Sequence, residues 1–342
     1  MTDITLRSVK GTSLSHNEMD NNFVASKSGR KNLVINGDFR IWQRGTSFTN
    51  ATSSYAYAAD RWRFFGQATT GSATVSRQAF TVGQTDVPGE PTYYLRWNQT
   101  VAATGTVALT QPIENVRTYA GSTVIINFYA KAAATRTIKV RLSQNFGSGG
   151  STTVSGTETD IDLTTSWQQF TATITLASIS GKTIGTSDYL DMVFLDSNSS
   201  TFTIDLANVQ VEAGSVATDF EYRPLTEEVA LCQRYYEKSY ATSIAPGTLV
   251  TAGSKRYQAC AAISTGTPTT ESFVVEKREI PTVTIYSPNS GSSGKAYNTT
   301  SAGDFTAFAS LTGTNGFGLS ASSAGISDQD LLSYHYTADA EL

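Results

Sequence analysis

The stretch TFTIDLANVQV, residues 201–211, decides the fold class, because its apolar residues keep the period of a strand and then change phase. Those apolar positions are Phe202, Ile204, Leu206, Val209 and Val211. Alternation of apolar and polar residues is typical of a strand with one buried face. The step from 206 to 209 breaks the alternation by one residue, which indicates a β-bulge, where one strand carries an extra residue. The stretch therefore predicts a bulged strand in a sheet.

Four segments that precede this stretch also predict strands. Residues 136–142 and 169–176 alternate between apolar and polar positions, whereas residues 123–130 and 189–195 are apolar on both faces and indicate central strands. Clusters of Gly, Ser and Asn separate the segments. Many short strands with such turn residues between them are typical of a β-sandwich or jelly roll. We therefore expect an all-β fold, with a jelly-roll or sandwich domain over residues 31–223.

A second boundary falls at Pro224, after which one helix is expected. Apolar residues from Leu225 to Tyr240 follow helical spacing. Thr226 is placed to cap this helix, and Lys238 would complement the dipole in its last turn. A smaller β domain follows, so that residues 224–342 form a linking helix plus a C-terminal β domain. Its expected strands are residues 256–263, 272–276, 282–286 and 331–337.

The first thirty residues predict a separate short helix. Ser15 and Glu18 fit a capping box, and Met19 and Phe23 lie one turn apart on one face of a helix over residues 16–27. A helix of about 12 residues is marginal in water by itself. We therefore expect it to dock on another chain; the alternative is that it packs on its own domain.

Composition and charge exclude several classes of protein. Hydrophobic residues make up 39% of the 342 residues and charged residues 16%, which is not the composition of a disordered chain. The formal net charge is -4, so a nucleic-acid-binding protein with a basic patch is not expected. No apolar run approaches the ~20 residues that cross a bilayer. The N-terminus has no apolar signal-peptide region, so neither membrane insertion nor Sec export is expected.

Cysteine and histidine counts limit the possible chemistry. Cys232 and Cys260 are the two cysteines and are expected to be buried and reduced; His16 and His335 are the two histidines, near opposite ends. Neither histidine lies in a nucleophile motif, and two are too few for a metal-histidine cluster. A catalytic carboxylate pair stays open. We expect no enzymatic activity, no catalytic residues and no cofactor apart from the structural calcium ion considered below.

Four groups of segments, in this order, resemble the tail-fibre or receptor-binding proteins of tailed bacteriophages. They are LRSVKGTSL (6–14) with EMDNNF (18–23); NLVINGDF (32–39) with IWQRG (41–45) and ADRW (59–62); DLANVQVEAG (205–214) through FEYRP (220–224); and ALCQRYY (230–236) with YTADAEL (336–342). The resemblance implies a homotrimer in the virion, assembled in the host bacterial cytoplasm. It implies other tail or baseplate proteins as partners, and a host cell-surface glycan or protein as the receptor. Residues 1–30 would attach to the virion through Leu6, Leu14, Met19 and Phe23.

The middle of the chain also resembles the jelly roll of carbohydrate-binding modules. QPIE (111–114), SWQQF (166–170) and the strand at 205–212 carry this resemblance. Many such modules hold a structural Ca²⁺, and the resemblance implies a site at Asp205 with Asp38, to which Asp60 could add oxygens. The alternative is that Asp205 caps or hydrogen-bonds a loop.

Candidate ligand-binding residues are aromatic, because flat rings stack on the apolar faces of sugars. Tyr55 and Tyr57 lie in a stretch without regular period, and Tyr297 and Phe317 lie in or beside Gly-rich loops of the C-terminal half. That half is expected to face the receptor; the alternative is that the jelly roll binds glycan. The tryptophans, Trp42, Trp62, Trp97 and Trp167, are expected to have structural roles, the last two in the core.

The sequence leaves three functions open. The first is a non-enzymatic phage adhesin that attaches to the tail by its N-terminus and adsorbs to host glycans. The second is a structural tail or baseplate component that binds only virion proteins. The third is a glycosidase or depolymerase with two catalytic carboxylates, which the absence of sequence repeats disfavours.

Overall fold

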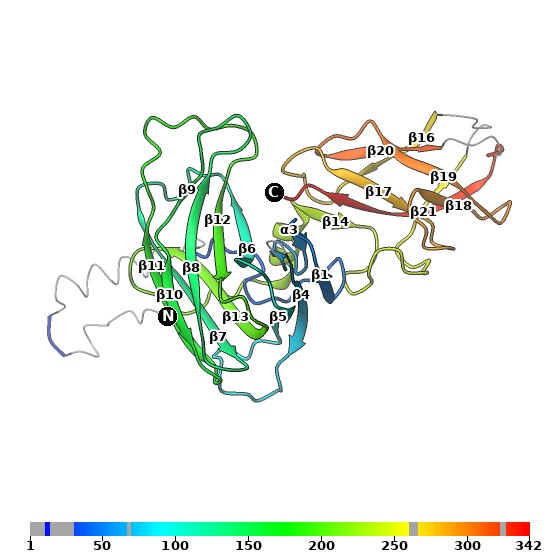
Figure 1. Cartoon of the computed structure of the whole chain (residues 1–342). Coiled ribbons are helices and arrows are strands. Elements are labelled where there is room, and N and C mark those ends of the chain that lie inside the picture. The colour runs from blue at the N-terminus through cyan, green and yellow to red at the C-terminus, as the bar shows by residue number, and fades with distance from the viewer. Residues whose placement is uncertain (1–10, 14–30, 67–69, 260–265, 322–325) are drawn as a thin grey trace.

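The computed structural model describes residues 11–13, 31–66, 70–259, 266–321 and 326–342. These residues form three antiparallel sheets and the helix α3 (Leu225–Gln233), which confirms the all-β class (Figure 1). The helix expected over residues 16–27, the attachment residues Leu6, Leu14, Met19 and Phe23, and Cys260 lie outside the described residues. Within the described part of the chain, no helix is long and apolar enough to span a membrane.

Two sheets face each other as a sandwich. The first has the order β1 (Ser47–Asn50), β4 (Ser72–Ala79), β5 (Tyr93–Val101), β13 (Phe202–Ala213), β7 (Thr123–Ala132) and β11 (Gln168–Thr175). The second has the order β10 (Thr159–Leu163), β8 (Arg136–Asn145), β12 (Tyr189–Asp196), β6 (Val107–Glu114), β3 (Arg63–Phe65) and β2 (Ala56–Tyr57), with β9 (Val154–Ser155) beside β8. Each of the five strands expected between residues 123 and 211 is present.

One hydrophobic core fills the space between the two sheets. Phe128 of the first sheet meets Phe194 of the second edge to face, with 5.0 Å between ring centroids. Trp62 and Trp97 are fully buried in the same core. Burying one such large side chain contributes about 1.5–3 kcal/mol relative to leaving it in water. This shared core holds the sandwich together.

The expected bulge is present in β13. Ala207 pairs with Tyr129 of β7 and Gln210 with Asn127, so β13 advances three residues while β7 advances two. The backbone of Asn208 is left-handed there, with φ 49°. The bulge is fixed from the other side by a hydrogen bond from the Val209 N–H to the Gly37 carbonyl (2.9 Å).

The third sheet belongs to the C-terminal part of the chain and has a core of its own. Its order is β14 (Tyr236–Lys238), β21 (Leu331–Asp339), β18 (Lys295–Asn298), β19 (Gly303–Ser310), β20 (Gly316–Ala321) and β16 (Gly266–Ser272), with β15 (Lys255–Gln258) and β17 (Thr282–Tyr286) also paired to β21. The strand expected at residues 272–276 is wrong, because β16 ends at Ser272. Beyond it, the Val274 N–H donates to the Glu237 carboxylate.

The helix expected from Thr226 to about Tyr240 is shorter. It begins at Leu225 with Pro224 at the N-cap and no side-chain cap, and it ends at Gln233. Tyr236–Lys238 pairs with β21 instead, because long-range pairing outweighs the weak local preference for helix. Lys238 therefore has no role at a helix end. Its ammonium is buried and donates to the carbonyls of Gln43, Thr242 and Ile244.

The third sheet joins the sandwich around α3 and the last residues of the chain (Figure 1). The guanidinium of Arg61 is buried, lies 3.4 Å from the ring centroid of Tyr235 and pairs with Glu341. The guanidinium of Arg44 lies 3.6 Å from the ring centroid of Tyr236 and pairs with Asp339 at 3.1 Å. These stacked and paired arginines tie the two parts of the chain together.

Candidate functional site

A cavity of about 340 Å³ opens on the face of the first sheet that points away from the core. It lies between that face and two covering segments, the loop around residues 80–92 and the segment 214–223. Its lining combines aromatic rings with amides and charged groups. The lining residues are Lys31, Pro88, Gly89, Asn127, Tyr129, Gln169, Asn208, Asp219, Phe220 and Tyr222.

Strand alternation places the floor of the cavity. On β7, Ile126 and Phe128 are in the core, so Asn127 and Tyr129 point to the opposite face. Gln169 of β11 is the cross-strand partner of Tyr129. The Gln169 amide donates to Asn127 Oδ1 (2.9 Å), which fixes the orientation of both side chains.

The bulge supplies the next polar group. Because β13 carries an extra residue, Asn208 points to the cavity side while Val209 returns to the core. Asn208 Nδ2 donates to the Tyr222 hydroxyl (2.9 Å) and to the Pro88 carbonyl (3.3 Å). Its Oδ1 is buried without a hydrogen-bond partner among the described residues. A buried acceptor without a partner is costly, so a donor supplied by a ligand would stabilise this position.

The segment 214–223 is folded back over the sheet by hydrogen bonds to outward side chains of β13. Glu212 accepts from the Thr218 N–H (2.7 Å), and Gln210 Oε1 accepts from the Glu221 N–H (2.8 Å). These bonds hold Phe220 and Tyr222 above the face, with 4.9 Å between their ring centroids. The segment thereby forms one aromatic wall of the cavity.

The tyrosine hydroxyls of the cavity remain neutral. Burial raises the pKa of both Tyr129 and Tyr222 above the ordinary value. A neutral hydroxyl both donates and accepts, and amides do the same. The cavity can therefore hold a hydroxyl-rich ligand through rings on one side and several hydrogen bonds on the other.

The metal site implied by Asp205 and Asp38 does not fit the structure. Both oxygens of Asp205 accept from the Arg96 guanidinium (2.7 and 2.9 Å), and Asp38 pairs with Arg40. A carboxylate already neutralised by an arginine is a poor Ca²⁺ ligand. No group of three or more acidic, His or Cys residues suited to a metal occurs in the described ranges. The alternative, that Asp205 caps or hydrogen-bonds a loop, does not match these contacts either, because Arg96 is its cross-strand partner on β5.

None of the four predicted ligand residues lines the cavity. The prediction that Phe317 binds ligand is wrong, because this side chain is 2% exposed and packs in the third sheet's core against Phe273 and Tyr336. Tyr57 donates its hydroxyl to the Leu342 O atom (2.6 Å), at the contact with the C-terminal segment. Tyr55 is 42% exposed, with the Arg63 guanidinium 4.4 Å from its ring centroid, and partial burial of the residue raises its pKa to about 12. Tyr297 is half-buried on β18.

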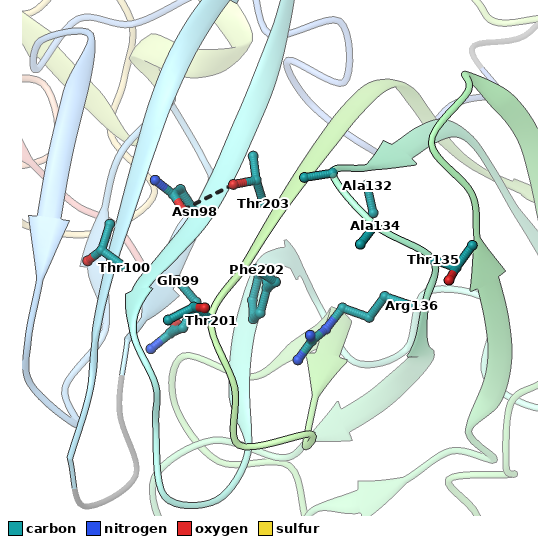
Figure 2. A pocket seen from close by; sticks show the side chains of 11 residues that line it. Asn98, Gln99, Thr100, Ala132, Ala134, Thr135, Arg136, Thr201, Phe202 and Thr203 are labelled. Atoms are coloured by element: carbon teal, nitrogen blue, oxygen red, sulfur yellow. Dashed lines mark hydrogen bonds between the residues drawn. The ribbon is translucent and has the colours of Figure 1, made fainter.

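A second cavity, of about 530 Å³, lies at one end of the sandwich (Figure 2). Figure 2 shows Asn98 and Thr203 joined by a hydrogen bond (3.2 Å) on its wall. The ring of Phe202 is mostly buried, and the guanidinium of Arg136 lies 4.6 Å from its centroid. Arg136 is itself held by Asp196. With its aromatic ring covered, this cavity is a weaker site for stacking than the first one.

Solved structures that resemble the chain include two carbohydrate-binding modules and a phage tailspike domain. The N-terminal cellulose-binding domain of β-1,4-glucanase C from Cellulomonas fimi is 18% identical; the match covers 46% of this chain and 90% of that one, with a TM-score of 0.30. A family 11 carbohydrate-binding module from Clostridium thermocellum, in complex with a mixed-linked tetrasaccharide, is 11% identical, with coverage of 50% and 98% and a TM-score of 0.31. The enzymatically active domain of tailspike protein 4 of bacteriophage CBA120 is 14% identical, with coverage of 54% and 21% and a TM-score of 0.32. At these identities and TM-scores the matches carry no functional argument.

Comparison with protein families adds no identification. No family model matches the chain, and no curated protein matches it.

Proposed function

We propose that this chain is a non-enzymatic glycan-binding protein of a phage tail, a tail fibre or receptor-binding protein. The observation that carries the glycan part is the cavity on the first sheet, which the rings of Tyr129, Phe220 and Tyr222 line together with the amides of Gln169 and Asn208. Rings for the apolar sugar face and amides for its hydroxyls are the chemistry that saccharide binding needs. This proposal gives the glycan site to the sandwich, in place of the C-terminal loops, since Phe317 is a core residue.

The virion part of the proposal is supported by the four ordered groups of sequence motifs. In it, residues 1–30 attach the chain to the tail, the protein acts as a homotrimer, and its place is the virion after assembly in the host cytoplasm. Replacing both Met19 and Phe23 by Ser should give protein that is absent from purified particles. Normal incorporation of this variant would contradict the attachment role.

Glycan binding is tested with the full chain and a panel of host-envelope polysaccharides. Gln169→Ala removes an amide from the cavity floor and should weaken binding about tenfold, which corresponds to about 1.4 kcal/mol. Gln168→Ala is the matched control, because Gln168 is the exposed neighbour on the same strand and does not line the cavity. Equal losses in both variants, or binding unchanged in Gln169→Ala, would reject the cavity as the site. A reducing-sugar assay on the bound polysaccharide should show no turnover.

A further inference from the structure

Next to the cavity, the same face of the sheet carries a second group of side chains. Trp167 comes two residues before Gln169, and Lys131 comes two residues after Tyr129. Residues two apart on a strand share a face and are about 7 Å apart. Gln169 and Tyr129 are cross-strand partners in the cavity floor. Trp167 and Lys131 therefore form the next pair on the same surface, and this pair with its neighbours is called the next level.

Three aromatic rings meet at this level. The ring centroids of Phe80 and Tyr94 are 4.8 Å apart, and those of Tyr94 and Trp167 are 5.3 Å apart. Tyr94 is on β5 and Trp167 directly precedes β11, with β13 and β7 between those two strands. The rings thus reach toward each other above the intervening strands. All three are half-buried and lie outside the sandwich core, so they leave aromatic surface beside the cavity.

The charges at this level do not cancel. The Arg96 guanidinium donates a hydrogen bond to each oxygen of the Asp205 carboxylate. The Lys131 ammonium is 3.9 Å from the same carboxylate and 5.2 Å from the Trp167 ring centroid, and it donates no hydrogen bond to a described residue. Its side chain is 31% exposed. Two cations and one carboxylate leave one positive charge here, on a chain with a net charge of -4.

We infer that the glycan bound by this protein carries an anionic group, a carboxylate or a phosphate, which the Lys131 ammonium binds while an adjoining sugar ring packs on Trp167. This inference rests on the proposed function and adds the class of glycan. An ammonium without a strong partner beside an aromatic ring suits an acidic sugar, because the ring takes the apolar face and the cation takes the charge. A neutral glycan would leave the Lys131 charge without a ligand partner.

The test uses polysaccharides in matched pairs. Polygalacturonate is compared with its carboxyl-reduced form, and a phosphomannan with its dephosphorylated form, so that one member of each pair lacks the anionic group. The unmodified chain should bind one acidic member about tenfold more tightly than its neutral partner. Lys131→Gln should remove that preference, so that it binds the two members of the pair about equally. The preference should shrink in high salt, because an exposed charge pair is screened.

The matched control is Lys139→Gln. Lys139 is an exposed lysine on β8 of the other sheet, where it pairs with Glu158 at 3.0 Å. Its substitution removes the same charge from the chain without changing the cavity side, so this variant should bind like the unmodified protein. Circular dichroism melts check that both variants fold. If the two variants have the same melting temperature, a loss of acid preference in Lys131→Gln is not due to unfolding.

The results distinguish failure of the inference from failure of the proposed function. If the unmodified chain binds both members of every pair equally, or if Lys131→Gln keeps the acid preference, the inference is overturned while glycan binding stands. If the unmodified chain binds neither the acidic nor the neutral polysaccharides, and Gln169→Ala does not change binding to the envelope panel, both the proposed function and the inference are rejected. The carboxylate and phosphate pairs separately show which anionic group is bound.

Discussion

Protonation of His335 should weaken the third sheet in mild acid. The ring is fully buried on β21 and stacks on Tyr240 with 3.7 Å between centroids. Nε2 lies 2.8 Å from the Val250 carbonyl, so this nitrogen carries the proton. Nδ1 is then the acceptor for the Ser239 hydroxyl at 2.9 Å. The neutral ring thus uses both nitrogens, whereas a second proton would face the Ser239 hydroxyl in a buried site.

The sign of the pH effect follows from the direction of the pKa. Burial lowers the pKa of His335 below 6.5, and the hydrogen bond to Val250 opposes this only in part. Below pH 6.5 the unfolded chain therefore binds this proton more readily than the folded chain. Stability contributed by the neutral ring is present above pH 6.5 and is lost as the pH falls, by up to about 1.4 kcal/mol per pH unit. Between pH 7 and pH 5 the loss is at most about 2 kcal/mol, a limit set by the ordinary pKa of the histidine in the unfolded chain.

Other groups titrate in the same window, so the assay has to isolate the histidine. Burial raises the pKa of Asp60 to about 6, and its contribution has the opposite sign, since it is lost as the pH rises through that value. Urea unfolding at pH 7, 6 and 5 should therefore be compared between the unmodified chain and His335→Gln. As the pH falls from 7 to 5, the unmodified chain should lose stability relative to His335→Gln, by at most about 2 kcal/mol in free energy of unfolding. His16→Gln, at the other histidine of the sequence, is the control. An identical pH slope in His335→Gln and the unmodified chain would refute the reasoning.

Substitutions at three further positions test the packing. Lys277→Met should lower the free energy of unfolding by about 3–5 kcal/mol in urea titrations, because it leaves the buried Glu237 carboxylate without its cation at 2.7 Å; a loss below about 1 kcal/mol would contradict this. Phe317→Ala should lower the free energy of unfolding by about 3–5 kcal/mol and leave glycan affinity unchanged. A loss of affinity in folded Phe317→Ala protein would show that Phe317 binds ligand after all. Asn208→Ala should be about 1 kcal/mol less stable than Asn208→Gly, because both lose the amide but only Ala places a Cβ at φ 49°. Equal melting temperatures of the two variants would argue against the left-handed bulge.

The sandwich can be predicted from sequence because its signals are local. Alternation along residues 136–142 and the phase slip after Leu206 depend only on which face of a strand is buried, and the structure confirms both. The helix predicted after Pro224 is too long for the opposite reason. Tyr236 has helical spacing in the sequence, but its backbone pairs with Asp339, about a hundred residues away, and local spacing contains no information about that partner.

The cavity cannot be predicted in the same way. Its residues come from the N-terminal side of the sandwich, a loop, three strands and the folded-back segment, which only the tertiary structure brings together. Trp167 shows how a local rule misleads. It precedes a cleanly alternating strand, which predicts a core position, yet it is half-buried on the outer face beside Tyr94. One usable signal is present in the sequence, namely the bulge, because bulges often re-aim a side chain beside a site.

That bulge links the stability of the sandwich to its site. Without the extra residue, the second half of β13 would shift by one position, and Val209 and Val211 would point away from the core they now fill. Burying those two valines therefore requires the irregular residue, and the irregular residue is Asn208, whose amide then lies at the cavity beside Tyr222. The position of the binding amide is thus set by core packing on the other side of the sheet. The bulge cannot be straightened without exposing two valines, so the core holds Asn208 in place even when no ligand is bound.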